Sequence, residues 1–109
     1  MAANARRGEI GAEFDGKPYR LCLTLGALAE LENAFGAGDL NALAERFGTG
    51  RLSAKDMMEI IAAGMRGGGV EIEAAELGRM QCDGGLAGYA RVVTQLLEAT
   101  FGSTAEAAV

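Results

Sequence analysis

YRLCLTLGALAELENAFGAGDLNALAERF, residues 19–47, is the stretch that decides the fold of this chain. Its opening, Tyr19–Thr24, alternates between apolar and polar residues with the two-residue period of a half-buried strand. From Leu25 onward the apolar residues recur every three or four positions, which is the period of an amphipathic helix. The change of period within so few residues predicts a strand that runs directly into a helix.

A second strand precedes this stretch. Glu9–Phe14 alternates in the same way, and the segment Asp15–Pro18 has the composition of a turn. We therefore expect an antiparallel hairpin with a four-residue connection, in which Phe14 pairs with Tyr19. A two-residue turn inside the same segment would set Phe14 opposite Lys17 instead. The longer connection is preferred because it matches apolar residues with apolar residues.

The chain beyond the hairpin predicts four or five mostly short helices, because stretches of helical period alternate with glycine-rich stops. The expected N-caps are Thr24, Asp39 and Ser53, whose side-chain oxygens can accept orphan backbone N–H groups. The run Gly67–Gly69 is expected to end the third helix and to serve as a flexible connection. The expected helices lie at about residues 25–35, 40–47, 54–66, 73–81 and 86–100.

These elements predict an α+β fold, in which the N-terminal β-hairpin packs against the helices. The chain of 109 residues is expected to form one domain at residues 8–102, with flexible tails at 1–7 and 103–109. The core is expected to be largely aliphatic, because the sequence has four Phe, two Tyr and no Trp. The predicted core residues are Phe14, Leu21, Leu23, Leu28, Leu31, Phe35, Ile60, Ile61, Val93 and Leu97.

Charge and the absence of histidine exclude several classes of function. The net charge is −5, whereas nucleic-acid binding requires a basic face, so no nucleic-acid partner is expected. A chain without histidine has no Ser-His-Asp or Cys-His arrangement and lacks the commonest metal ligand. We therefore expect no enzymatic activity, no cofactor and no metal. Cys22 and Cys82 are interpreted as reduced thiols without a catalytic role.

The sequence also argues against export and against a membrane partner. The first ten residues, MAANARRGEI, have no apolar stretch of the kind found in signal peptides. No apolar run approaches the roughly 18 residues that a membrane span requires. We therefore expect a cytoplasmic protein.

Several segments carry a resemblance to a known family. They are Gly8–Ile10, Asp15-Gly16, Leu21–Glu32 and Arg51–Ser53. In these segments the chain resembles small proteins of gene transfer agents that are related to phage tail assembly chaperones. The resemblance covers most of residues 8–66 and continues more weakly in the last helix, whereas residues 68–85 match least.

The resemblance implies a function that the residues alone do not. A protein of this kind would act as a tail assembly chaperone that binds the tape measure protein while the tail of a gene transfer agent or prophage particle assembles. The alternative is a minor structural component of the tail or tail tube. The implied partners are the tape measure protein and the tail tube protein, with homo-oligomers left open. The implied location is the cytoplasm of a bacterial host, or the tail itself.

A chaperone of this kind needs an apolar groove for a helical segment of its partner. We place this groove along the central helices, at Leu43, Phe47, Met58 and Met65. Met58 lies off the apolar stripe of its helix, and methionine suits surfaces that adapt to a partner. Two alternatives are that these residues bury one another or that they contact a second copy of the chain.

Overall fold

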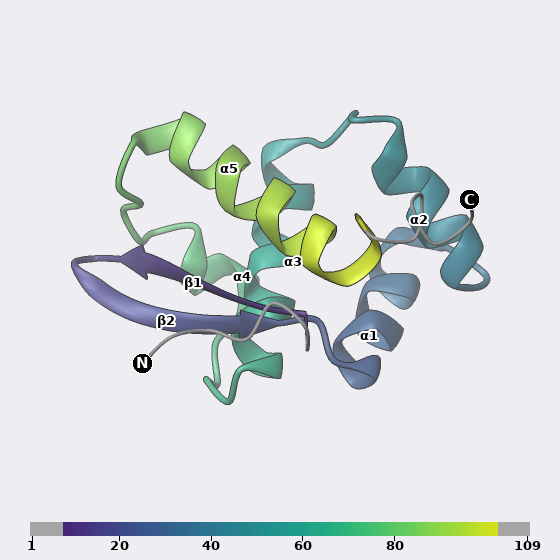
Figure 1. Ribbon diagram of the computed structural model, residues 1–109, viewed down its shortest axis with the longest axis horizontal. Coiled ribbons are helices and arrows are strands. Elements are labelled where there is room, and N and C mark those ends of the chain that lie inside the picture. Colours follow the sequence, from purple (N-terminus) through teal and green to yellow (C-terminus); the bar gives the residue numbers. More distant parts are fainter. Residues whose placement is uncertain (1–7, 103–109) are drawn as a thin grey trace.

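The computed structural model describes residues 8–102, and its architecture confirms the predicted α+β class. An N-terminal hairpin is followed by helices that pack around the central helix α3 (Figure 1). The predicted tails at 1–7 and 103–109 lie outside the described residues. The elements are β1 (Glu9–Phe14), β2 (Lys17–Cys22), α1 (Leu25–Phe35), α2 (Leu40–Gly48), α3 (Ala54–Gly67), α4 (Ala74–Leu77), α5 (Gly85–Leu97) and the π-helical segment η2 (Glu98–Gly102).

The register of the hairpin differs from the prediction. Phe14 pairs with Lys17, so the connection has two residues rather than four. Asp15 and Gly16 adopt φ values of 54° and 76°, the left-handed pair that a tight two-residue turn requires. Gln81 fixes this turn, because its carbonyl accepts from the backbone N–H of Asp15 and its N–H donates to Asp15 Oδ1, both at 2.8 Å. These contacts outweigh the cost of an unmatched lysine at the exposed end.

The same side chains nevertheless face the core in both registers. The observed pairing is shifted by two residues from the predicted one, and side chains alternate between faces with a period of two. Phe14 and Leu21 are therefore fully buried as predicted. Leu23 is also buried, although it lies just beyond the end of β2.

The three predicted N-caps are confirmed. Thr24 Oγ1 accepts from the N–H of Ala27 at 3.1 Å, and Asp39 Oδ1 accepts from that of Ala42 at 2.8 Å. Ser53 forms a capping box with its partner three residues on, in which each side chain accepts from the other residue's N–H. The caps fix where α1, α2 and α3 begin, so these starts could be predicted from local sequence.

The core lies between the hairpin and the helices, and α1, α2, α3, α4 and α5 all contribute buried side chains to it. Every predicted core residue except Phe35 and Leu97 is buried, and these two are half-buried against the core. Leu96 is fully buried in place of Leu97. Val93 is buried as predicted, and Gly88, Val92 and Leu96 complete the buried face of α5.

The predicted end of the third helix is confirmed, since α3 ends at Gly67, but Gly67 and Gly68 form a close packing contact rather than a flexible connection. A Cβ atom on Gly67 would lie 1.9 Å from the carbonyl oxygen of Cys22, and one on Gly68 would lie 1.9 Å from that of Arg20. The end of α3 therefore lies directly against the backbone of β2. Only glycine permits this approach, which is a long-range requirement that the local sequence does not reveal.

The last two predicted helices differ in extent. The predicted helix at 73–81 shortens to α4, Ala74–Leu77, where the buried Leu77 anchors a single turn. The predicted helix at 86–100 begins at Gly85, and its α-helical part ends at Leu97 before continuing as η2.

Candidate interaction surface

A small apolar hollow lies where α3, α4 and the start of α5 meet. Its volume is about 170 Å³. Its lining includes the exposed Leu86, which leaves 71% of its surface accessible. The lining residues are Ala54, Met57, Met58, Ile61, Leu77, Gly78, Leu86 and Tyr89. A second, shallower hollow shares Leu86 and Tyr89, so the two form one continuous apolar region, here called the α3–α5 hollow.

Two local contacts shape the α3–α5 hollow. A Cβ atom on Gly78 would lie 2.4 Å from the sulfur of Met58, so the absence of a side chain at Gly78 leaves room for that of Met58. The hydroxyl of Tyr89 donates a hydrogen bond to the carbonyl of Met80 and ties α5 to the loop after α4. Burial raises the pKa of Tyr89, and Cys82 and Asp15 add to the effect, so the phenol stays protonated as a donor.

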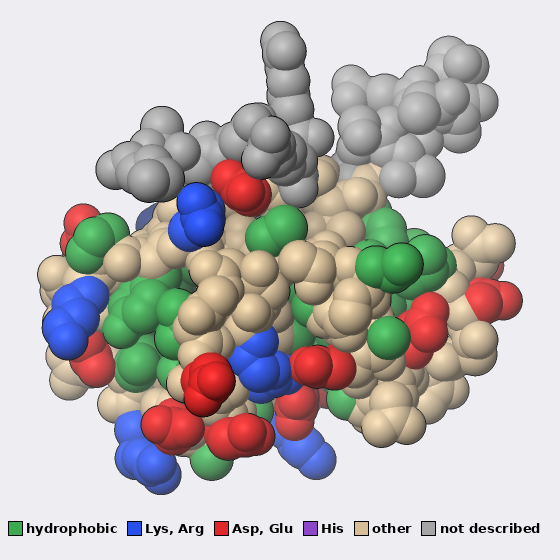
Figure 2. Space-filling view, turned by 90° about the horizontal axis from the view of Figure 1, so that it is seen from below, with side chains coloured by type: hydrophobic (Ala, Val, Ile, Leu, Met, Phe, Trp, Pro, Cys, Tyr) green, Lys and Arg blue, Asp and Glu red, His purple; other side chains and the backbone are tan. Residues whose placement is uncertain are grey.

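The surface of the domain carries charges of both signs. Figure 2 shows one face, on which acidic and basic side chains lie interspersed. Hydrophobic side chains form a patch toward the left of this view, at the end of the molecule where the turn of the hairpin lies in Figure 1, and a second group toward the right. Apolar area on this face is therefore not confined to one end.

The structure separates the four residues that were predicted to line a partner groove. Leu43, Phe47 and Met65 are buried, with exposed fractions of 0%, 6% and 0%. Met58 is half-buried and lies in the α3–α5 hollow. The four side chains do not share one open groove, because α2 folds its apolar face inward against α1. A partner-binding role stays a prediction for each of them, and Met58 is the one that reaches the surface.

Leu86 and Tyr89 of the hollow lie in the helix predicted at residues 86–100, and the sequence did not indicate that either reaches the surface. An apolar residue at helical spacing can be exposed or buried, and the pattern alone does not distinguish the two. Met80 and Gly78 come from the segment whose structure was hardest to predict. No local pattern shows that this segment folds back over α3.

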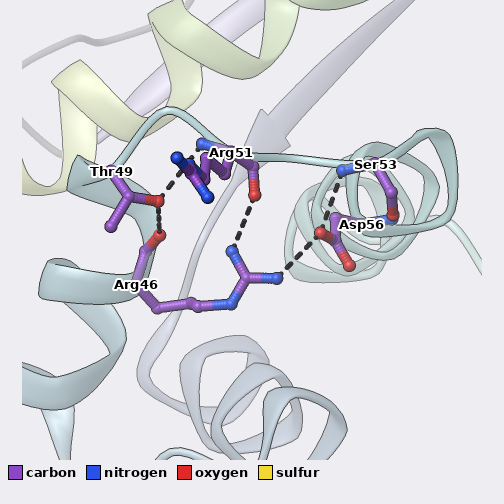
Figure 3. A network of polar contacts seen from close by, with 5 residues as sticks. All are labelled: Arg46, Thr49, Arg51, Ser53 and Asp56. Carbon is purple, nitrogen blue, oxygen red and sulfur yellow. Dashed lines mark hydrogen bonds and ion pairs between the residues drawn. The ribbon is translucent and has the colours of Figure 1, made fainter.

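A polar network joins α2 to α3 (Figure 3). The guanidinium of Arg46 donates to the carbonyl of Arg51 at 2.8 Å and to Asp56 Oδ2 at 3.0 Å. Asp56 Oδ2 also accepts from the N–H of Ser53 at 3.0 Å. This backbone hydrogen bond and then Arg46 lower the pKa of Asp56 below its ordinary value of 3.8, against the opposing effect of burial. The network holds the loop between the two helices.

The two thiols lie in surroundings that disfavour reactivity. Burial, with a contribution from Glu9, raises the pKa of Cys22 above its ordinary value of 9.0, although Arg20 acts in the opposite direction. Burial likewise raises the pKa of Cys82, with Asp83 adding to it. The thiolate is the nucleophilic form, so both groups are protonated and weakly nucleophilic near neutral pH.

Neither a metal-binding cluster nor a membrane-spanning helix is found in the part of the chain that the structure describes. Within residues 8–102, no three Cys, Asp or Glu side chains gather closely enough to hold a metal ion. Over the same residues, no helix has both the length and the apolar character to cross a membrane.

The fold defines a small α+β domain that carries an apolar hollow on its surface. The family model described as "Phage tail tube protein, GTA-gp10" matches residues 7–103. The chain belongs to this family, which makes it a phage-tail protein of the gene transfer agent kind. No curated protein and no solved structure matches the chain.

Proposed function

We propose that this chain is a structural component of the tail of a phage-like particle, at or next to the tail tube. The observation that carries the proposal is the family match, which spans the whole described domain. The protein would accumulate in the bacterial cytoplasm before assembly and would then remain in the particle.

The test is the composition of purified particles. The protein is expected to co-purify with intact tails after washes in high salt and mild detergent, at a constant ratio to the major tail protein by quantitative mass spectrometry. The control for adventitious binding uses tails from cells that lack the gene. The purified protein is added to these tails, and they are then washed and measured in the same way. A protein that is required for tail formation yet absent from finished particles would contradict a structural role.

The second candidate function is a chaperone for the tape measure protein. The observation that favours it is the α3–α5 hollow, which places the adaptable side chains of Met57 and Met58 beside the exposed Leu86. A hollow of this kind can accept one or two apolar anchors from an amphipathic helix. The same hollow could instead contact another copy of the chain. The Met58→Asp experiment below distinguishes this self-association from binding of the tape measure protein.

Met58→Asp discriminates between these possibilities. A charge in the hollow is expected to weaken capture of a co-expressed tape measure protein at least tenfold while the domain stays folded, because Met58 is only half-buried. Leu25→Asp is the matched control, since Leu25 is 75% exposed on a different helix. Unchanged capture by Met58→Asp would remove the hollow from the chaperone hypothesis. A change in oligomeric state by light scattering, with no effect on capture, would assign the hollow to self-association.

The proposed roles act through binding and require no catalysis. Supporting observations are the absence of histidine and the raised pKa values of both thiols. No metal or nucleotide is proposed to take part. Stoichiometric zinc by elemental analysis, or a clear increase in thermal stability with ATP, would overturn this part of the proposal.

A further inference from the structure

The glycines on either side of α2 differ from the closely packed Gly67 and Gly68 at the end of α3. Gly36 and Gly38 precede the helix, whereas Gly48 and Gly50 end and follow it. A Cβ atom added to any of these four would meet no other atom within 4 Å. Packing therefore does not require glycine at these positions. What glycine supplies there is conformational freedom of the backbone, and Gly36 and Gly50 use it at φ values of 66° and 72°.

Between these glycines, α2 is held by few side chains. Leu43 and Phe47 are its buried residues, and the rest of the helix is exposed or half-buried. The ring of Phe47 packs edge-on against Phe35 of α1 at 5.3 Å and lies 6.4 Å from the ring of Phe101. These aromatic contacts join α2 to α1, the first helix of the chain, and to η2, the last helical segment.

Arg46 is the polar connection between α2 and its surroundings. Its guanidinium reaches the loop at Arg51 and the first turn of α3 at Asp56, and it lies 5.6 Å from the centre of the Phe35 ring. A single side chain therefore contacts α1, the loop and α3 at once, as Figure 3 shows for the polar contacts. Removal of this side chain would leave the helix attached only through its apolar face.

We propose that α2 is a hinged lid, which opens as a unit about the paired glycines and is held closed by Arg46. Opening carries Leu43 and Phe47 out of the core and uncovers the ring of Phe35. Elements with few buried contacts are the ones that open locally while the rest of a domain stays folded. The proposal concerns the domain itself and holds whichever role the protein has in the tail.

The test is hydrogen exchange of the full-length chain, followed by mass spectrometry under native conditions. Amides of residues 40–48 are expected to exchange faster than those of α3 and α5. Arg46→Gln should increase the exchange rate of the α2 amides about tenfold and leave those of α3 and α5 unchanged. The matched control is Arg66→Gln. Arg66 also bridges elements, through Glu30 and the carbonyl of Ile72, but none of its hydrogen bonds reaches α2.

The hinge itself is tested by the double variant Gly38→Ala and Gly48→Ala. Both sites have room for a methyl group and neither has a positive φ, so the backbone can stay as it is. The variant should slow exchange of the α2 amides severalfold, because stiffer connections open less often. Equal acceleration of all helices in Arg46→Gln would show that α2 does not open separately. Unchanged α2 exchange in both variants would remove the lid altogether.

Discussion

Glycine serves opposite purposes in two regions of this domain. At the junction of α3 with β2, Gly67 and Gly68 allow two backbones to touch, and a Cβ on either would collide with a carbonyl oxygen. Around α2, by contrast, Gly38 and Gly48 stand in open space. The first pair fixes a contact and the second pair frees a helix. The number of glycines in a sequence therefore says little about rigidity until the surroundings of each are known.

The largest expected effect that tests this comparison is that of Gly67→Ala. The added methyl group would lie 1.9 Å from the carbonyl oxygen of Cys22, and a backbone atom cannot turn aside as a side chain can. We expect a loss of about 3 kcal/mol in the free energy of unfolding, measured by urea denaturation. A loss near zero would mean that α3 can move off β2 at little cost, and the junction would no longer count as the fixed region.

Gly48→Ala should have a smaller effect of opposite sign. Position 48 is the last residue of α2, has no neighbour within 4 Å of a Cβ atom and does not adopt a positive φ. Alanine is a better helix former than glycine, so the variant is expected to gain about 0.5 kcal/mol in the free energy of unfolding. The same denaturation experiment measures it. Destabilisation would show that the open surroundings of α2 are not available to a side chain.

The smallest expected effect is the pH dependence of the Arg46 contact. The pKa of Asp56 is lowered in the folded state, so its contribution to stability is present above the ordinary value of 3.8 and is lost as the pH falls through the lower, folded value. Wild type should therefore be more stable than Asp56→Asn at about pH 7, and the difference should shrink as the pH falls below 3.8. The comparison of their urea midpoints across this range checks the sign. A difference that does not shrink as the pH falls would assign the effect of the substitution to packing.

The parts of the fold that could be predicted from sequence are those governed by neighbouring residues. Thr24, Asp39 and Ser53 cap helices through hydrogen bonds that span three residues, and all three were identified. The buried face of the hairpin was also identified, since a two-residue period survives a two-residue shift. The turn itself was not: its Asp-Gly pair is a local signal for a two-residue turn, but matched apolar neighbours were preferred. The contacts with Gln81 that fix Asp15 come from far along the chain.

The candidate surface was predicted less well, for the same reason. An apolar stripe indicates which side chains one helix must cover but does not identify the neighbour that covers them. Leu43 and Phe47 were therefore predicted to bind a partner, although both are buried within the domain. Phe47 packs against Phe35 of α1 and Phe101 of η2. Leu86, which has the same character, stays exposed because no described element crosses it. Met58 could be recognised as different only through its position off the stripe.

The close approach of α3 to β2 also bears on aggregation. A two-stranded sheet offers unpaired backbone groups to any extended chain that it meets, and such strand addition is the usual route to edge-to-edge association. At Arg20 and Cys22 the glycines of α3 occupy the space that an incoming strand would need. A bulkier residue could not lie so near and would leave room for a foreign strand. The glycine junction thereby keeps this side of the hairpin from growing into a larger sheet.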